Sequence, residues 1–215
     1  MPRTPRRRRR WPWVVLAAVV VILIPVGLVV VPILTHEDQG VSTQADAVDA
    51  WPTQVSAVGD DGRTRELGVF PADPGAAVDT SALAVGDRIV VSGSGYDASR
   101  GVYVAICAVP DSPAVKPGPC LGGVPDQEGQ PESEEGAVQF APSNWINDEW
   151  AWRLFGARAF DDVTTGTFTA YLEVPEPVET AVDCRAVECA IYTRNDHTAA
   201  SDRVQDVRIP VGFAD

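Results

Sequence analysis

The chain has 215 residues, 45% of them hydrophobic, and a formal net charge of −13 at pH 7. Six of its 17 basic residues precede Trp11, so the remainder sets 11 basic residues against 30 acidic ones, a net charge of −19. This acidity excludes a nucleic-acid-binding function, which depends on Lys and Arg contacts to phosphates, and it is typical of a solubilised exported domain. A cationic protein partner or loosely held divalent ions are the alternative explanations of the charge.

The N-terminus has the pattern of a membrane anchor. Residues 1–10 carry the six arginines, and residues 11–35 contain no charged side chain. About 20 apolar residues cross a bilayer core, and a basic tail stays cytoplasmic, with Trp11 and Trp13 at the interface. We therefore predict a basic cytoplasmic tail and one transmembrane helix over 11–35, a signal anchor in the cell membrane. A cleavable signal peptide is the alternative, because "ADA" at 45–47 resembles a cleavage site, but such peptides have a shorter apolar region.

The polar and small residues of 36–52 predict a tether. Beyond it, residues 53–215 are enough for one extracytoplasmic domain with its own core. Turn sequences at 59–63 and 92–101 separate stretches with strand-like patterns. These stretches lie at 88–93, 101–109, 137–141, 166–174, 189–194 and 204–213.

Two of these stretches alternate with the period of a half-buried strand. In "GTFTAYLEV" Phe168, Ala170 and Leu172 fall on one face. In the last stretch Pro210 lacks a donor for the strand ladder, so that strand lies at an edge or has its missing donor pointing outward. We expect about seven short strands in an all-β, immunoglobulin-like β-sandwich.

Residues 142–162 interrupt this pattern with clustered aromatic side chains. One interpretation is a short helix or ordered loop that caps an open end of the sandwich, its aromatics buried. The other is a partner-binding surface, because tryptophan is enriched at binding hot spots. The candidate partner-binding residues are Trp145, Trp150, Trp152 and Phe155.

The cysteines number four, an even count that indicates two disulfides in an exported domain. Of the three possible pairings, proximity in sequence favours Cys107 with Cys120 and Cys184 with Cys189. Their spacing does not match a structural zinc site. No metal or other cofactor is predicted.

The sequence gives little support for catalysis, and we predict that the chain is not an enzyme. His36 and His197 are the histidines, and no nucleophile motif accompanies them. Asp196 precedes His197, but adjacency in sequence does not make a triad, whose members meet in space. The acidic run at 126–135 predicts a solvated loop and lacks the ligand alternation of a calcium-binding loop.

The successive segments "VGDRIVVSGSGYD", "YVAICAV" with "GPC", "VDCRAVECAIY" and "VRIPVGF" resemble the neocarzinostatin family, the apoproteins of enediyne antibiotics. The resemblance covers about residues 64–215. It implies a seven-stranded immunoglobulin-like sandwich with two disulfides and a ligand cleft. The chain is more similar still to the neocarzinostatin-like modules of actinobacterial surface proteins.

The cleft that the resemblance implies would present Cys107, Val109, Ala190, Tyr192 and Arg194. The antibiotic carriers have an aromatic residue at the position of Val109 and small or polar residues at those of Tyr192 and Arg194. The larger side chains at those last two positions would fill the cleft. The resemblance therefore implies a shared fold without the antibiotic.

Together these patterns predict a membrane-anchored extracytoplasmic interaction module that binds another membrane or cell-surface protein. The aromatic insertion and the Tyr192–Arg194 face are its candidate contact surfaces. The alternative is binding of a small apolar ligand in the cleft, chromophore-like or haem, with Tyr192 or His197 as the haem ligand.

Overall fold

The computed structural model describes residues 11–45, 48–123 and 138–214. The predicted basic tail at 1–10 and the acidic run at 126–135 lie outside the described residues. The chain divides into two units, Met1–His36 and Glu37–Asp215, and each is described by itself.

The first unit contains one helix, α1 (Trp11–Leu34), which is 24 residues long. The helix expected over 11–35 is therefore present. Over the described residues, no helix is both long and apolar enough to cross a membrane. The membrane crossing stays a prediction.

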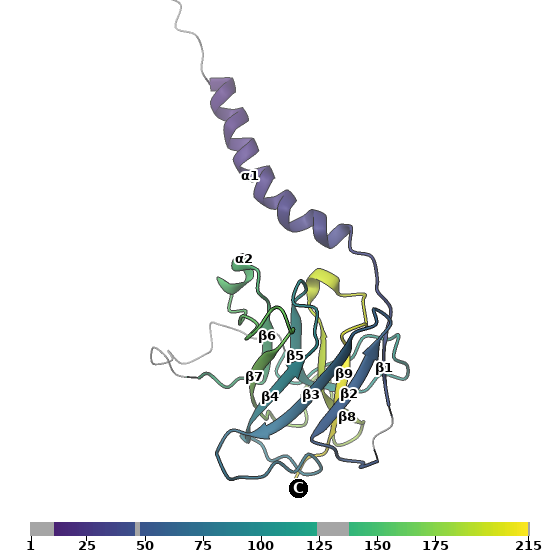
Figure 1. The fold of residues 1–215 in the computed structure, drawn as a ribbon. Coiled ribbons are helices and arrows are strands. Elements are labelled where there is room, and N and C mark those ends of the chain that lie inside the picture. Colours follow the sequence, from purple (N-terminus) through teal and green to yellow (C-terminus); the bar gives the residue numbers. More distant parts are fainter. Residues whose placement is uncertain (1–10, 46–47, 124–137, 215) are drawn as a thin grey trace, which may run out of the picture. The chain divides into compact units, whose positions relative to one another are not determined.

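The second unit is a sandwich of two antiparallel sheets (Figure 1). The first sheet has five strands, in the spatial order β1 (Ser42–Gln44), β2 (Gln54–Gly59), β3 (Thr64–Pro71), β4 (Arg88–Ser94) and β7 (Phe168–Glu173). The second sheet has four, in the order β6 (Ser143–Ile146), β5 (Val102–Ala108), β8 (Cys189–Asn195) and β9 (Val207–Val211). The two-sheet architecture is confirmed, although the described residues form nine strands where about seven were predicted.

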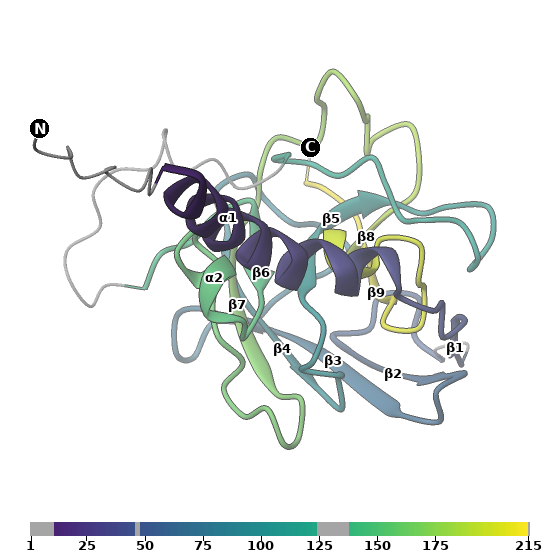
Figure 2. The same ribbon diagram turned by 90° about the horizontal axis from the view of Figure 1, so that it is seen from above.

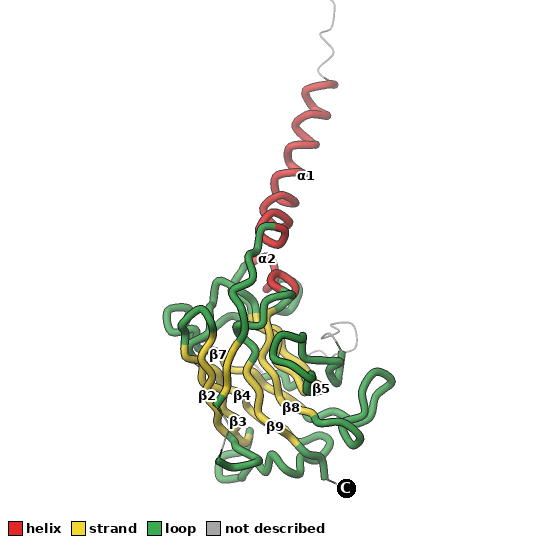
Figure 3. The backbone as a smooth tube through the Cα atoms, turned by 90° about the vertical axis from the view of Figure 1, so that its right-hand side faces the viewer, coloured by secondary structure: helices red, strands yellow, loops and turns green. Residues whose placement is uncertain are grey.

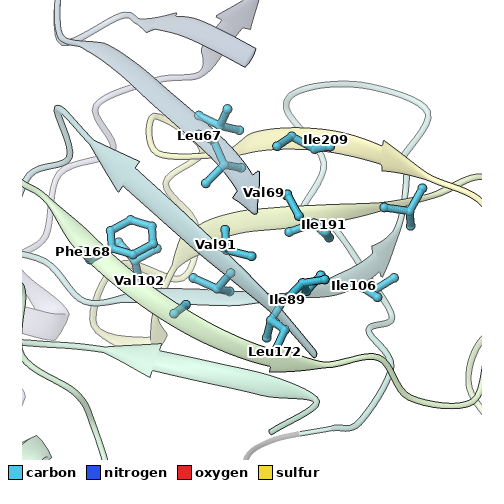
Figure 4. Packing of buried hydrophobic residues seen from close by; sticks show 14 of the residues in the cluster. Leu67, Val69, Ile89, Val91, Val102, Ile106, Phe168, Leu172, Ile191 and Ile209 are labelled. Atoms are coloured by element: carbon cyan, nitrogen blue, oxygen red, sulfur yellow. The ribbon is translucent and has the colours of Figure 1, made fainter. Parts of the chain in front are cut away.

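The core lies between the sheets and takes one face of each long strand. Alternate side chains of β3, β4, β5, β7, β8 and β9 meet there, as Figure 4 shows. In β7 Phe168, Ala170 and Leu172 are buried, so the alternation predicted for this strand is confirmed. Pro210 lies in β9, an edge strand of its sheet, also as predicted.

Two expectations about strands were wrong. Residues 36–52 are not a free tether, because Ser42–Gln44 pairs with β2 and the Ser42 hydroxyl donates to the Val204 carbonyl at 2.7 Å. The stretch at 137–141 forms no strand over its described part; only Ala141 makes an isolated bridge, to Leu172. The strand instead follows at β6, inside the predicted insertion.

Two amide side chains hydrogen-bond to the backbone of an edge strand, one in each sheet. Gln44 donates from Nε2 to the Arg208 carbonyl (2.9 Å), and its Oε1 accepts from the Arg208 N–H (3.1 Å), on edge strand β9. Asn144 does the same for Tyr171 on edge strand β7, at 2.8 and 3.1 Å. Each amide satisfies a backbone donor and a backbone acceptor that an edge strand otherwise leaves open.

Two short helical turns lie at one end of the sandwich. They are α2 (Trp150–Arg153) and the 3-10 turn η1 (His197–Ala199). The C-terminal residues lie at the other end (Figure 3). The two helical turns and the C-terminal residues therefore lie on different surfaces of the sandwich.

Candidate functional site

The outer face of the second sheet carries rows of neighbouring side chains from successive strands. Because side chains alternate along a strand, every second residue of β8 projects from this face. The structure places the predicted residues Ala190, Tyr192 and Arg194 on it. The three rows are Trp145–Tyr103–Arg194, Ser143–Ala105–Tyr192–Arg208 and Cys107–Ala190–Pro210.

Both disulfides form with the pairing that the sequence favours, Cys107 with Cys120 and Cys184 with Cys189. Cys107 is 1% exposed and packs on this outer face in a small apolar cluster with Ala105, Ala190 and Tyr192. The first disulfide closes the loop at 108–119 onto the same face. The Pro117 carbonyl of that loop accepts a hydrogen bond from Arg194 Nη1 at 3.2 Å.

A cleft of about 430 Å³ opens between this loop and the segment 41–44. Of the predicted cleft residues, Val109 and Tyr192 line it, whereas Ala190 and Arg194 do not. Tyr192 is 4% exposed, and its hydroxyl accepts from Arg208 Nη1 at 3.4 Å. Burial raises the pKa of Tyr192, against the opposing effect of Arg208.

The expectation that Tyr192 and Arg194 form a contact surface was therefore wrong. Tyr192 is buried, and Arg194 is half-buried beneath the carbonyl of Pro117. The Arg194 guanidinium lies 5.6 Å from the centroid of the Tyr103 ring, a cation–π geometry within the fold. These side chains hold the loop rather than face a partner.

Asp206 also lines the cleft, and no motif or periodicity in the sequence points to it. Its side chain is 9% exposed, and Oδ2 accepts from Arg203 Nη1 at 2.9 Å, whereas Oδ1 has no hydrogen-bond partner among the described residues. Burial raises the pKa of Asp206 to about 7, although the charge and hydrogen bond of Arg203 oppose the rise. Its carboxyl group therefore titrates in the neutral range.

This pKa predicts that the protein loses stability as the pH rises from about 4 toward 7. The folded carboxyl holds a proton that the unfolded one releases near its ordinary pKa of about 3.9, so folding takes up a proton in this window and higher pH opposes it. Thermal unfolding at pH 5 and pH 8 measures the difference. Asp206→Asn is expected to reduce it, and an unchanged pH dependence in that variant would contradict the assignment.

The aromatic insertion is divided between buried and exposed side chains, so the capping interpretation, with the aromatics buried, holds for only part of it. Phe160 is 6% exposed and belongs to the core. Trp145 and Trp152 are half-buried and pack around His197, with ring centroids 5.3 and 4.7 Å from its imidazole. The Tyr103 hydroxyl completes this aromatic cluster with a 3.1 Å hydrogen bond to His197 Nδ1.

Asp196 fixes the insertion to the rest of the sandwich. It is 1% exposed, and Oδ2 accepts from Trp145 Nε1 at 2.9 Å and Asn147 Nδ2 at 2.8 Å. Oδ1 accepts from the N–H and hydroxyl of Thr198 at the start of η1. A side chain at Gly101 would collide with this carboxylate, so glycine is required there. These bonds hold the base of the insertion rigidly.

An apolar patch lies next to this base. We define it as Trp150, Leu154 and Phe155. Their exposed fractions are 73%, 71% and 66%. None of these three described residues belongs to the core cluster. Large apolar groups clustered on a rigid surface are typical of interaction sites.

The sequence neighbours Asp196 and His197 hydrogen-bond to different residues. The carboxylate of Asp196 bonds to Thr198, Trp145 and Asn147, and His197 bonds to Tyr103 instead. Tyr192 and His197, the candidate haem ligands, lie in different places, the cleft and the aromatic cluster. Among the described residues, no group of three His, Cys, Asp or Glu side chains is placed to hold a metal ion.

Comparisons with known proteins add little. No family model and no curated protein matches the chain. Among solved structures, macromomycin is similar over 69% of this chain and 99% of its own, at 17% identity and a TM-score of 0.36. Macromomycin is a neocarzinostatin-family apoprotein, but a likeness at this level carries no argument about this chain.

Proposed function

We propose that this chain is a membrane-anchored extracytoplasmic interaction module without catalysis. Its contact surface is the apolar patch, which binds another membrane or cell-surface protein. The observation that supports this is the exposure of Trp150, Leu154 and Phe155 on a turn that Trp152 and Trp145 hold in place. Tryptophan and other large side chains on a rigid base lose little conformational entropy on binding.

The anchor in this proposal rests on the sequence. Residues 11–35 carry no charge and follow a run of arginines. The arginine run then favours an extracytoplasmic second unit.

The proposal predicts that Trp150→Ala with Leu154→Ala removes partner binding without unfolding the protein. Each large apolar side chain at a hot spot contributes about 2 kcal/mol or more, so the pair should lower co-purification about tenfold or more. The full-length protein is purified in mild detergent from its own cells, and the co-purifying protein is quantified.

Two measurements make this test decisive. Val85→Ala, at an exposed site in the turn before β4, is the matched control and should change nothing. The melting temperature of the double variant should stay within about 2 °C of the parent, a shift of less than about 1 kcal/mol. Unchanged co-purification, or a double variant that simply aggregates, would contradict the proposal.

The cleft supports a second candidate function, binding of a small ligand. Its volume of about 430 Å³ is within the range of small-molecule sites, and Val109 and Tyr192 line it. Native mass spectrometry of the full-length protein released from detergent tests this function. A retained small molecule supports it, and the bare polypeptide mass in every preparation contradicts it.

A further inference from the structure

A hollow of about 400 Å³ lies on the outer face of the five-stranded sheet, over strands β2, β3 and β4. Figure 2 shows these three strands side by side, with β3 in the middle. The hollow shares no lining residue with the cleft or with the apolar patch. The side chains around it are those of Gln54, Ser56, Glu66, Phe70, Ser92 and Ser94.

Gly68, in the middle of β3, leaves room for this hollow. It pairs with Gln54 on one side and with Ser92 on the other in an unbroken register, and its φ is not in the left-handed region. Neither a bulge nor a turn therefore requires glycine here, and glycine weakens the interior of a strand. A glycine in such a position often marks the close approach of a ligand.

Five polar side chains around the hollow have donors and acceptors that the protein does not use. Gln54, Ser56 and Glu66 are exposed, and Ser92 and Ser94 are half-buried. Among the described residues, none of these five side chains hydrogen-bonds to another group of the protein. The hydroxyls and the amide can both donate and accept, and the carboxylate accepts. Such groups suit a ligand that carries many hydroxyl groups.

Phe70 provides an apolar contact beside these polar groups. Its side chain is 40% exposed, and the tip of its ring leans over Gly68, where an added Cβ would lie 2.9 Å from Cε2 and 3.0 Å from Cζ. A sugar ring has C–H groups on its faces and hydroxyls around its edge. The negative face of an aromatic ring attracts such C–H groups, so one aromatic ring among hydroxyl side chains matches both features of a sugar.

Other classes of ligand fit the hollow less well. No described Lys or Arg side chain lines it, so an anion would meet the Glu66 carboxylate without a compensating positive charge. Each of the three strands is paired on both sides, which leaves no backbone edge for the addition of a peptide strand. An apolar ligand would remove water from the five polar side chains without replacing their hydrogen bonds.

We propose that this hollow is a binding site for a neutral carbohydrate. One sugar ring packs against Phe70 above Gly68, and its hydroxyls exchange hydrogen bonds with Ser92, Ser94 and Gln54. The site depends neither on the membrane anchor nor on the apolar patch, so its failure in the test below leaves the proposed function unaffected.

Calorimetric titration of the full-length protein, in a detergent without a sugar headgroup, tests the proposal. The probes are maltotriose, cellotriose, mannotriose, galactotriose and chitotriose, whose sugar rings differ in stereochemistry and substituents. At least one should bind with a Kd below about 1 mM. Heparin, a sulfated glycan, should not bind, because its charge is repelled by Glu66.

Variants of the hollow link this binding to its residues. Phe70→Ala should weaken binding at least about tenfold, whereas Phe70→Trp should keep the Kd within about threefold of the parent, because it preserves an aromatic face. Val58→Ala, at an exposed position of β2 outside the hollow, is the matched control and should leave the Kd unchanged. In NMR titrations the amide shifts should be concentrated in 54–56, 66–70 and 92–94.

Four outcomes overturn the inference. They are a Kd above about 1 mM for all five trisaccharides, binding that Phe70→Ala leaves unchanged in a folded variant, binding of heparin, and amide shifts around the cleft residues Val109 and Tyr192 instead of the hollow. Shifts of the same amides with protein concentration alone would identify a second copy of this chain as the occupant, which also overturns the assignment of a carbohydrate.

Discussion

Replacing Asp61 with alanine is expected to lower the free energy of unfolding by about 3–5 kcal/mol, because it leaves an unpaired charge inside the protein. The Arg65 side chain is 0% exposed, and its Nη1 and Nη2 donate to Oδ1 and Oδ2 of Asp61 at 3.0 and 2.5 Å. The guanidinium also lies 5.9 Å from the centroid of the buried Tyr96 ring. Without Asp61 no other carboxylate among the described ion pairs faces this guanidinium.

Two controls separate the buried charge from ordinary surface electrostatics. Arg63 lies 3.8 Å from Asp61 but is 50% exposed, so Arg63→Ala should cost less than about 1 kcal/mol. The double variant Asp61→Ala with Arg65→Met should be more stable than Asp61→Ala alone, because it removes both charges. Urea unfolding measures all three. An Asp61→Ala variant as stable as Arg63→Ala would show that water reaches Arg65.

The same pair has an expected pH dependence. Burial opposes ionisation of Asp61, but the hydrogen bond from Arg65, the Arg63 N–H and both guanidinium charges together lower its pKa. A lowered folded pKa contributes stability that is present above the unfolded value and is lost as the pH falls through the folded one. The contribution of this pair therefore disappears in acid, on the opposite side of the pH scale from that of Asp206.

Where a strand presents one face to the core, the sequence was enough to find it. The alternation of Phe168, Ala170 and Leu172 specifies both the strand and its buried side. Strand β1 could not be found this way, because its three residues are polar or small and are held by hydrogen bonds to β2 and Val204. Those partners are distant in sequence, so no local hydrophobic periodicity indicates the contacts with them.

The candidate site likewise has features that the sequence predicts and others that it does not. Alternation along β8 places Ala190, Tyr192 and Arg194 on one face, but it does not show that the loop carrying Pro117 covers them. The dense aromatic run also has no period that separates Trp152, packed on His197, from the exposed Trp150.

One local signal was available and would have helped. The order Asp196-His197-Thr198 is an Asx-turn pattern, in which an aspartate side chain accepts from the N–H two residues on. The structure has this bond at 2.8 Å. The pattern marks the end of β8 and the turn that carries His197, although it does not reveal that Asp196 also binds Trp145 and Asn147.

Removing the first disulfide, by Cys107→Ala with Cys120→Ala, is expected to cost about 3 kcal/mol of unfolding free energy. The cysteines are 13 positions apart, and the chain-entropy estimate for a ring of that length is about 3 kcal/mol. For a domain of this size, each kcal/mol lowers the melting temperature by about 2–4 °C. We therefore expect a fall of roughly 6–12 °C by calorimetry.

The second disulfide provides the comparison that tests this explanation. Cys184 and Cys189 are 5 positions apart, so Cys184→Ala with Cys189→Ala should cost only about 2 kcal/mol. The first pair should also free its loop, where the Ala108 N–H donates to Pro119 and the Gly118 N–H donates to Ala108. Hydrogen exchange at these two amides should accelerate more than exchange in β9. A larger cost from the shorter ring would show that packing around the sulfur atoms, and not loop entropy, sets the contribution of each bond.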